Sequence, residues 1–182
     1  MDTSIIYLVG FMGAGKSSVG AHLARLLGWT FVDLDTVIEE REGVPIREIF
    51  NRRGEARFRE IEHAELEKAS RGHNLVVALG GGAFCSESNQ EIVKATGISI
   101  WLDAPVDLLM SRCAPDGARP LFTNRAEMEA LLRSRIAYYA KADIRLDVTD
   151  LSIDAAAQKL IPLCMARKRN MGDGTPASER GS

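Results

Sequence analysis

Hydrophobic residues along this chain gather in short continuous runs, and longer stretches of mixed apolar and polar residues separate these runs. A short run rich in β-branched residues predicts a strand buried on both faces, whereas the mixed stretches predict helices with one apolar side. The predicted strands are Ile5–Val9, Trp29–Val32, Asn74–Leu79, Ile98–Leu102 and Ile144–Val148. Because helices separate the strands, we expect right-handed crossovers in an α/β fold, a three-layer doubly wound sandwich with a five-stranded parallel sheet.

Two segments interrupt this alternation of strands and helices. The predicted helices lie at Ser17–Leu27, Glu87–Lys94, Pro105–Met110, Ala126–Tyr139 and Ile153–Ala166. Residues 36–70 form the first interruption, a helical insert in which Gly43-Val44-Pro45 and Arg53-Gly54 divide two or three helices. Residues 112–124 form the second, an irregular loop that we expect to be mobile. Binding residues concentrate in such interruptions, so the function is expected there.

The composition fits one globular domain. The chain has 182 residues, of which 46% are hydrophobic and 26% charged. We assign residues 1–166 to the domain and expect residues 167–182, which are basic and then rich in Gly, Pro and Ser, to be a disordered tail. A net charge of −2 gives no general attraction to nucleic acid or to an anionic membrane. With no basic leader and no long apolar run, we expect a cytoplasmic protein.

The segment from Gly10 to Ser17 matches the pattern GxxxxGK[ST] between a predicted strand and a predicted helix. Glycines there let backbone N–H groups surround phosphate oxygens, and the helix N-terminus adds partial positive charge. Lys16 would reach the β- and γ-phosphates of ATP, and the Ser17 hydroxyl would coordinate Mg²⁺. The residues expected to bind nucleotide are Gly13, Ala14, Gly15, Lys16, Ser17 and Ser18. The alternative is a glycine-rich turn with a solvated lysine.

Two carboxylates, Asp33 and Asp35, follow the second predicted strand. They lie on the same side if the chain is still extended there. One would then hold water around Mg²⁺, and the other would accept a hydrogen bond from a substrate hydroxyl as a positioning group or base. The alternative is a strand end followed by an aspartate N-cap for a helix at Thr36.

Together these motifs resemble the shikimate kinase family, over roughly residues 5–165. In that family a GxxGxGK[ST] loop follows the first strand and a DxD motif follows the second. The resemblance implies the fold of a P-loop kinase similar to the nucleoside monophosphate kinases. It also implies an enzyme that transfers the γ-phosphoryl group of ATP to the 3-hydroxyl of shikimate, giving shikimate 3-phosphate and ADP. In this likeness Asp33 belongs to the metal shell, and Asp35 contacts the shikimate hydroxyls.

Two motifs in the middle of the chain extend the resemblance. Residues 54–62 are similar to the family signature GE-x-x-FR-x-x-E, which implies that Arg59 binds the substrate carboxylate. A bidentate arginine fixes both the charge and the orientation of a carboxylate. The alternative for Arg59 is a surface ion pair on an amphipathic helix. Gly80, Gly81 and Gly82 match a glycine triplet whose backbone would donate to substrate oxygens, the alternative being a plain loop that needs positive φ.

Two further motifs lie in the C-terminal half. Arg119-Pro120-Leu121 is similar to the RPL motif of the family's lid, which implies that Arg119 closes on the transferring phosphoryl group, with Arg112 near the adenine. Arg135-Ile136-Ala137-Tyr138-Tyr139 is similar to R-x-x-x-Y, which implies that Arg135 is the second partner of the substrate carboxylate. The family commonly has proline where this chain has Ala137. Relatives cover the adenine with the segment that corresponds to residues 147–152.

The sequence therefore predicts a kinase with Lys16, Asp35 and Arg119 as catalytic residues and Mg²⁺ as cofactor. We expect a monomer whose partners are ATP and shikimate, with no nucleic acid or membrane partner. One alternative is another P-loop small-molecule kinase, such as one for gluconate or a nucleoside monophosphate. The other alternative is a nucleotide-binding module without phosphotransfer.

Overall fold

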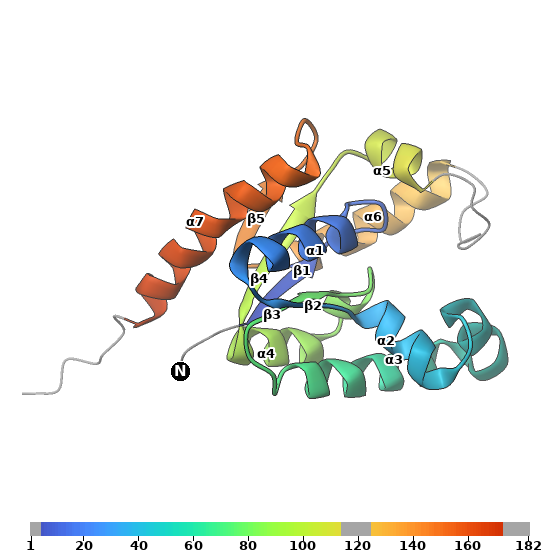
Figure 1. The fold of residues 1–182 in the computed structure, drawn as a ribbon. Coiled ribbons are helices and arrows are strands. Elements are labelled where there is room, and N and C mark those ends of the chain that lie inside the picture. Colours follow the sequence, from blue (N-terminus) through green and yellow to red (C-terminus); the bar gives the residue numbers. More distant parts are fainter. Residues whose placement is uncertain (1–4, 114–124, 173–182) are drawn as a thin grey trace, which may run out of the picture.

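The computed structural model describes residues 5–113 and 125–172, and their side chains as far as residue 166. Five strands form one sheet in the order β2-β3-β1-β4-β5, and every neighbouring pair is parallel. The strands are β1 Ile5–Val9, β2 Thr30–Asp33, β3 Leu75–Ala78, β4 Ile98–Asp103 and β5 Ile144–Asp147. This arrangement confirms the predicted five-stranded parallel sheet (Figure 1).

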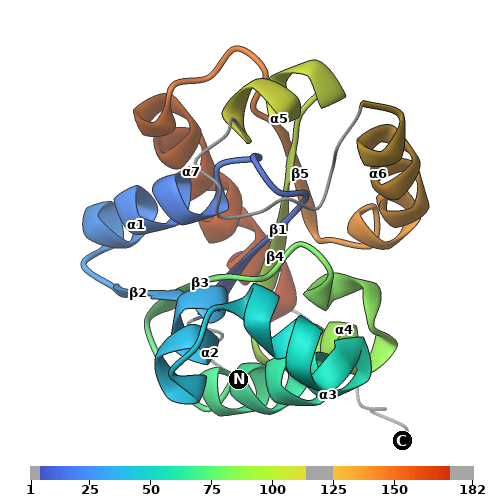
Figure 2. The same ribbon diagram turned by 90° about the vertical axis from the view of Figure 1, so that its right-hand side faces the viewer.

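Helices cover both faces of the sheet. They are α1 Lys16–Leu27, α2 Leu34–Glu42, α3 Ile46–Ala69, α4 Glu87–Thr96, α5 Val106–Arg112, α6 Arg125–Tyr139 and α7 Ile153–Gly172, with a short 3₁₀ helix η1 at Ala83–Cys85. Figure 2 shows α1 and α7 packed together on one side of the sheet and α3, α4 and α6 on the other. Among the described helices, none is both long and apolar enough to cross a membrane.

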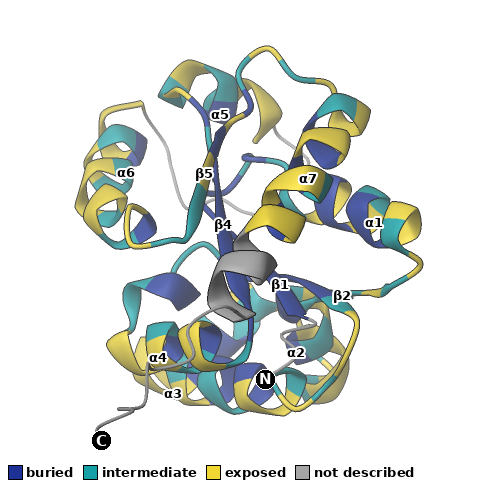
Figure 3. Ribbon diagram, turned by 90° about the vertical axis from the view of Figure 1, so that its left-hand side faces the viewer, coloured by how far each residue is buried: buried dark blue, intermediate teal, exposed yellow. Residues whose placement is uncertain are grey.

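The core follows the sheet (Figure 3). Every residue of β1 is buried, and so are the first five residues of β4, which explains why both strands read as unbroken apolar runs. Tyr7, in the middle of β1, is fully buried and satisfies its hydroxyl with Thr96 at 2.8 Å. The two central strands therefore hold the loop that follows β1 on a rigid base.

The second strand ends later than its pattern predicts, and the helix after it begins earlier. β2 includes Asp33, and α2 begins at Leu34 instead of Thr36. One carboxylate oxygen of Asp33 accepts from the N–H groups of Asp35 and Thr36, at 3.1 and 3.5 Å. An aspartate N-cap is therefore present, but at Asp33, and it bends the chain out of the strand at once.

Glycine and proline divide the insert where the sequence predicts. Gly43, in the left-handed region at φ 68°, ends α2, and Pro45 precedes α3. Gly54 interrupts α3 with φ 77° and ψ 170°, so two helical segments meet there at a kink.

One predicted helix ends later in the structure, and most of the predicted lid lies outside the described residues. Helix α7 continues to Gly172, six residues past the predicted end at Ala166, so the segment predicted as a tail begins inside a helix. Residues 114–124, most of the predicted lid, lie outside the described residues, as does Arg119.

Candidate active site

A cleft of about 670 Å³ opens at the carboxyl ends of the strands, where parallel α/β sheets bind ligands. The loop after β1, the end of β2 and the beginning of α7 all contribute to its lining. Residues lining it are Met12 to Val19, Asp33, Asp35, Ala78, Leu79, Arg112, Val148, Leu151, Ser152, Ile153 and Ala156. The cleft thus brings together all residues expected to bind nucleotide except Arg119.

The loop after β1 has the backbone that a phosphate cradle requires. Gly13 and Gly15 have φ of 77° and 90°, a conformation that other residues rarely adopt. A Cβ on Gly13 would also lie 2.7 Å from the carbonyl oxygen of Leu109, so only glycine fits there. Gly15 caps α1, and the helix N-terminus therefore faces the cleft.

Lys16, the first residue of α1, folds back over this loop. Its Nζ donates to the carbonyl oxygens of Gly10 and Phe11, both at 2.9 Å. The side chain is half-buried and bonded, so the alternative of a solvated lysine is not what the structure has. These bonds hold the ammonium group over the cradle.

Ser17 and Asp33 bring two hard oxygen donors together beside the cradle. Ser17 Oγ donates to Asp33 Oδ2 at 2.5 Å. Mg²⁺ prefers oxygen ligands and takes only one or two from the protein in phosphate sites, so this pair fits a magnesium ion bound to a nucleotide. The other Asp33 oxygen caps α2, which fixes the carboxylate in place.

Asp35 lies in the first turn of α2 and not, as expected, in a strand extension beside Asp33. It nevertheless lines the cleft. A Cβ on Gly80 would lie 2.7 Å from Asp35 Oδ1 and 2.8 Å from Glu62 Oε1. Both carboxylates therefore close on the glycine triplet after β3, and a side chain at position 80 would collide with them.

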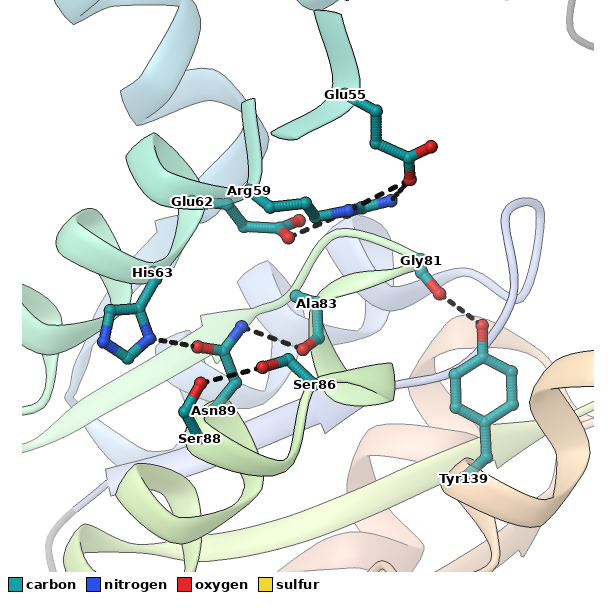
Figure 4. A network of polar contacts seen from close by, with 10 residues as sticks. All are labelled: Glu55, Arg59, Glu62, His63, Gly81, Ala83, Ser86, Ser88, Asn89 and Tyr139. Carbon is teal, nitrogen blue, oxygen red and sulfur yellow. Dashed lines mark hydrogen bonds and ion pairs between the residues drawn. The ribbon is translucent and has the colours of Figure 1, made fainter. Parts of the chain in front are cut away.

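Arg59 reaches the same triplet from α3 (Figure 4). Its Nη1 donates to Glu62 at 2.7 Å and its Nη2 to Glu55 at 3.0 Å. A Cβ on Gly82 would lie only 2.6 Å from Arg59 Nη2. The guanidinium also stacks near the ring of Phe58, with Cζ 5.2 Å from the centroid. Arg59 thus forms ion pairs along its own helix, as the alternative expected, and the pair with the buried Glu62 fixes the guanidinium beside Gly82.

Arg135 approaches the triplet from the opposite side, on α6. Its Nη1 would lie 3.4 Å from a Cβ on Gly81, and its Cζ stands 5.7 Å from the centroid of the Phe11 ring. The helix runs through Ala137 to Tyr139. Two guanidinium groups distant in sequence therefore flank one short loop, an arrangement suited to a carboxylate.

The glycine triplet owes its composition to close approach and not to backbone angles. None of Gly80, Gly81 and Gly82 has positive φ, so the alternative of a loop that needs positive φ is wrong. Side chains of Asp35, Glu62 and Arg59 occupy the space where Cβ atoms would be. The triplet lets these three side chains lie directly on the backbone.

Arg112, the last residue of α5, lines the cleft beside the phosphate loop. Its Nη1 would lie 4.0 Å from a Cβ on Gly15. This places Arg112 at the nucleotide end of the cleft, and its contact with adenine stays a prediction.

Sequence reasoning gave no role to two features of the site. Glu62 is the last letter of the GE-x-x-FR-x-x-E signature, but nothing in a charged helix shows which acid is buried. In the structure 1% of its side chain is exposed, and burial raises the pKa of Glu62, with Arg59 opposing the shift. The second feature is the wall of Val148 and residues 151–156, where the sequence indicated a segment but no individual residue.

The fold and this cleft define a P-loop kinase. A family model described as shikimate kinase matches residues 12–164. The chain therefore belongs to the shikimate kinase family.

Individual relatives agree. A shikimate kinase of Persephonella marina is 46% identical over 142 residues, which cover 78% of this chain and 87% of that protein. A solved structure of shikimate kinase from Acinetobacter baumannii in complex with shikimate has 38% identity and a TM-score of 0.86, covering 91% of this chain and 94% of that one. A gluconokinase from Sinorhizobium meliloti is 16% identical with a TM-score of 0.61, over 94% of this chain and 97% of that one, and shares the fold alone.

Proposed function

We propose that this shikimate kinase transfers the γ-phosphoryl group of ATP to the 3-hydroxyl of shikimate, giving shikimate 3-phosphate and ADP. One observation carries the proposal: Asp35, Arg59 and Arg135 converge on the glycine triplet beside a phosphate-binding loop. An acceptor with hydroxyls and a carboxylate suits one acid and two guanidinium groups. The Acinetobacter protein was solved with shikimate, and we assign the same acid to this pocket.

The nucleotide end of the cleft would bind ATP through its backbone and one cation. The loop N–H groups and the N-terminus of α1 face the phosphates, and Lys16 exchanges its carbonyl partners for phosphate oxygens. Ser17 and Asp33 would hold Mg²⁺, which when bound supplies positive charge to the phosphate oxygens. The walls at Arg112 and residues 151–156 would contain the base and sugar.

The acceptor end would orient the attacking hydroxyl. Arg59 and Arg135 would bind the carboxylate of shikimate from two sides, which fixes the ring in one orientation. Asp35, at the boundary between the two ends, would accept a hydrogen bond from the hydroxyl that attacks. Phosphoryl transfer needs little covalent work from the protein, so positioning and charge neutralisation account for most of the catalysis.

Arg119 belongs to this proposal through the resemblance alone, because it lies outside the described residues. It would close over the reaction and neutralise charge on the transferring group. We further propose that the enzyme acts as a monomer in the cytoplasm.

The decisive measurement is ADP release by the purified protein with Mg²⁺–ATP, in the presence and absence of shikimate. We expect shikimate to stimulate ADP release strongly, and gluconate or nucleoside monophosphates to give no stimulation. Preference for an acceptor without a carboxylate would contradict the assignment of the two arginines. ATP turnover that no acid stimulates would instead favour a nucleotide-binding module.

A further inference from the structure

Tyr139, at the end of α6, makes a hydrogen bond that the proposed chemistry does not yet use. Its hydroxyl donates to the carbonyl oxygen of Gly81, in the middle of the glycine triplet (Figure 4). The tyrosine is 1% exposed, and its ring packs against Trp101 with centroids 6.0 Å apart. A buried phenol on a loop carbonyl fixes the orientation of one peptide group.

The same peptide group also carries the N–H of Gly82. In a trans peptide the C=O and N–H bonds point in opposite directions, so the carbonyl of Gly81 and the N–H of Gly82 are linked. Tyr139 holds the carbonyl on the side of α6, and Figure 4 shows Arg59 on the other side of the triplet. The N–H of Gly82 is therefore directed away from Tyr139, toward the side where Arg59 lies against Gly82.

A second buried side chain holds the next part of the loop. Asn89 on α4 donates from Nδ2 to the carbonyl of Ala83 at 2.9 Å, and its Oδ1 is bonded to His63 Nδ1 at 2.6 Å. Asn89 is 2% exposed. With Gly81 and Ala83 both held, rotation of the peptides between them is restricted from two helices.

We propose that Tyr139 is a positioning residue for the acceptor. Its hydroxyl orients the 81–82 peptide so that the Gly82 N–H donates to the carboxylate that Arg59 binds. This inference rests on the proposed function, since it needs an acidic acceptor in the pocket. Tyr139 itself touches no substrate; besides the carbonyl of Gly81, its hydroxyl also interacts with the Arg135 guanidinium.

The hydroxyl of Tyr139 and not its ring carries this role. Trp101 and the surrounding core hold the ring, and Phe at position 139 would keep that packing. Burial raises the pKa of Tyr139, with Arg135 opposing the shift, so the phenol stays protonated and remains a donor. A carbonyl that accepts from a permanent donor keeps one orientation across the pH range in which the enzyme works.

The test is Tyr139→Phe, with Tyr138→Phe as the matched control. Tyr138 directly precedes Tyr139 in the chain and is partly exposed. Its ring centroid lies 5.6 Å from Lys141 Nζ. For Tyr139→Phe we expect the KM for shikimate to rise about tenfold, the size of effect of one hydrogen bond to a charged group. The KM for ATP should stay within about twofold. Tyr138→Phe should change neither constant.

A destabilised fold must be told apart from a lost orientation. Val93→Ala removes buried volume from α4 and lowers the melting temperature without touching the triplet. It should leave the KM for shikimate unchanged. If Val93→Ala raises that KM as much as Tyr139→Phe does, the hydroxyl has no specific role and the inference is wrong.

Shikimate-stimulated ADP release by the wild-type enzyme shows whether the proposed function or the role of Tyr139 has failed. If the wild-type enzyme shows no such release, the proposed function fails. If it does, and Tyr139→Phe keeps the wild-type KM for shikimate, the proposed function stands and the role of Tyr139 is overturned. An equal rise in both KM values for Tyr139→Phe would also overturn it, because a role at Gly82 does not reach the nucleotide.

Discussion

Glu62 Oε2 accepts from Arg59 Nη1 at 2.7 Å, while Glu62 Oε1 is buried with no hydrogen-bond partner in the part of the chain that the structure describes. The second oxygen faces Gly80 together with Asp35. Burial raises the pKa of Glu62, and the nearby Asp35 carboxylate acts in the same direction. The surroundings of the glycine triplet thus include an electrostatically unfavourable acid, and this acid fixes the arginine that we propose binds the substrate.

Glu62→Gln should trade activity for stability. The native pKa lies above the ordinary 4.5, so the contribution of Glu62 to stability is fully present below that value. This contribution is lost as pH rises through the native pKa. Gln cannot ionise, so at pH 7 the variant should have a higher melting temperature than wild type. Its KM for shikimate should rise several-fold because Arg59 loses an ionic partner.

Melting curves between pH 4 and 8 check the sign of this effect. The advantage of Glu62→Gln should vanish toward pH 4, where the wild-type carboxyl is protonated. Glu60→Gln on the same helix, whose partner is the exposed Arg57, should show no such dependence. A variant that melts lower than wild type at pH 7 and does not recover at pH 4 would refute the argument.

Arg59→Ala should weaken acceptor binding selectively. Two charge-assisted hydrogen bonds are worth about 3 kcal/mol, so the KM for shikimate should rise about 100-fold. The KM for ATP should change little, because Arg59 lies against Gly82 and is not among the residues that line the cleft around the phosphate loop. The control is Arg57→Ala, an exposed arginine of the same helix bonded to Glu60 at 2.6 Å. Unchanged shikimate saturation with weakened ATP binding would show that Arg59 is wrongly assigned.

Asp33 caps α2 and also places a charge beside Ser17, and two substitutions distinguish these roles. Asp33→Asn keeps an oxygen for the N-cap of α2 but removes the charge beside Ser17. We expect a normal melting temperature and a higher Mg²⁺ concentration at half-maximal rate. Asp33→Ala removes the cap as well, at a cost of about 1 kcal/mol, or about 2–4 °C. Equal melting temperatures for the two variants would show that the cap contributes nothing.

Gly82→Ala should block the acceptor pocket without unfolding the protein. Gly82 has φ −104°, which alanine adopts easily, but its Cβ would lie 2.6 Å from Arg59 Nη2. We expect a melting temperature within about 2 °C of wild type and at least about a tenfold higher KM for shikimate. Gly54→Ala is the opposite case: a Cβ at position 54 would meet no neighbouring atom, but the backbone has φ 77°, which alanine rarely adopts. It should lower the melting temperature, and a Gly82→Ala enzyme with wild-type KM would contradict the proposed pocket.

Much of the fold was predictable because its signals are local. The apolar runs of β1 and β4 are buried on both faces, and each turn of the insert has its own glycine or proline. The start of α2 was misplaced because Asp33 is compatible with both a strand end and a helix cap. The choice depends on whether its carboxylate meets the N–H groups of the next residues, as it does in the structure, where Asp33 also pairs with Ala78 of β3.

The site was predictable to the extent that its residues belong to contiguous motifs. Lys16 and Ser17 follow a strand and are found from spacing, whereas the glycine triplet, Arg59 and Arg135 were assigned to the site by resemblance. Tyr139 was part of the R-x-x-x-Y motif, but its bond to Gly81 was not foreseen because it joins segments 58 residues apart and depends on how α6 packs. Similarly, no pattern in α3 distinguishes the buried Glu62 from the exposed Glu60.

The two carbonyl bonds of Lys16 make the cradle selective for charge. A neutral molecule entering the loop offers the ammonium group acceptors no better than the Gly10 and Phe11 oxygens it already has. A polyphosphate offers bonds roughly twice as strong, because the acceptor is itself an anion. Nucleosides and sugars without phosphate would therefore gain nothing from this lysine, and in the proposed function the loop would favour a triphosphate over the far more varied uncharged molecules around it.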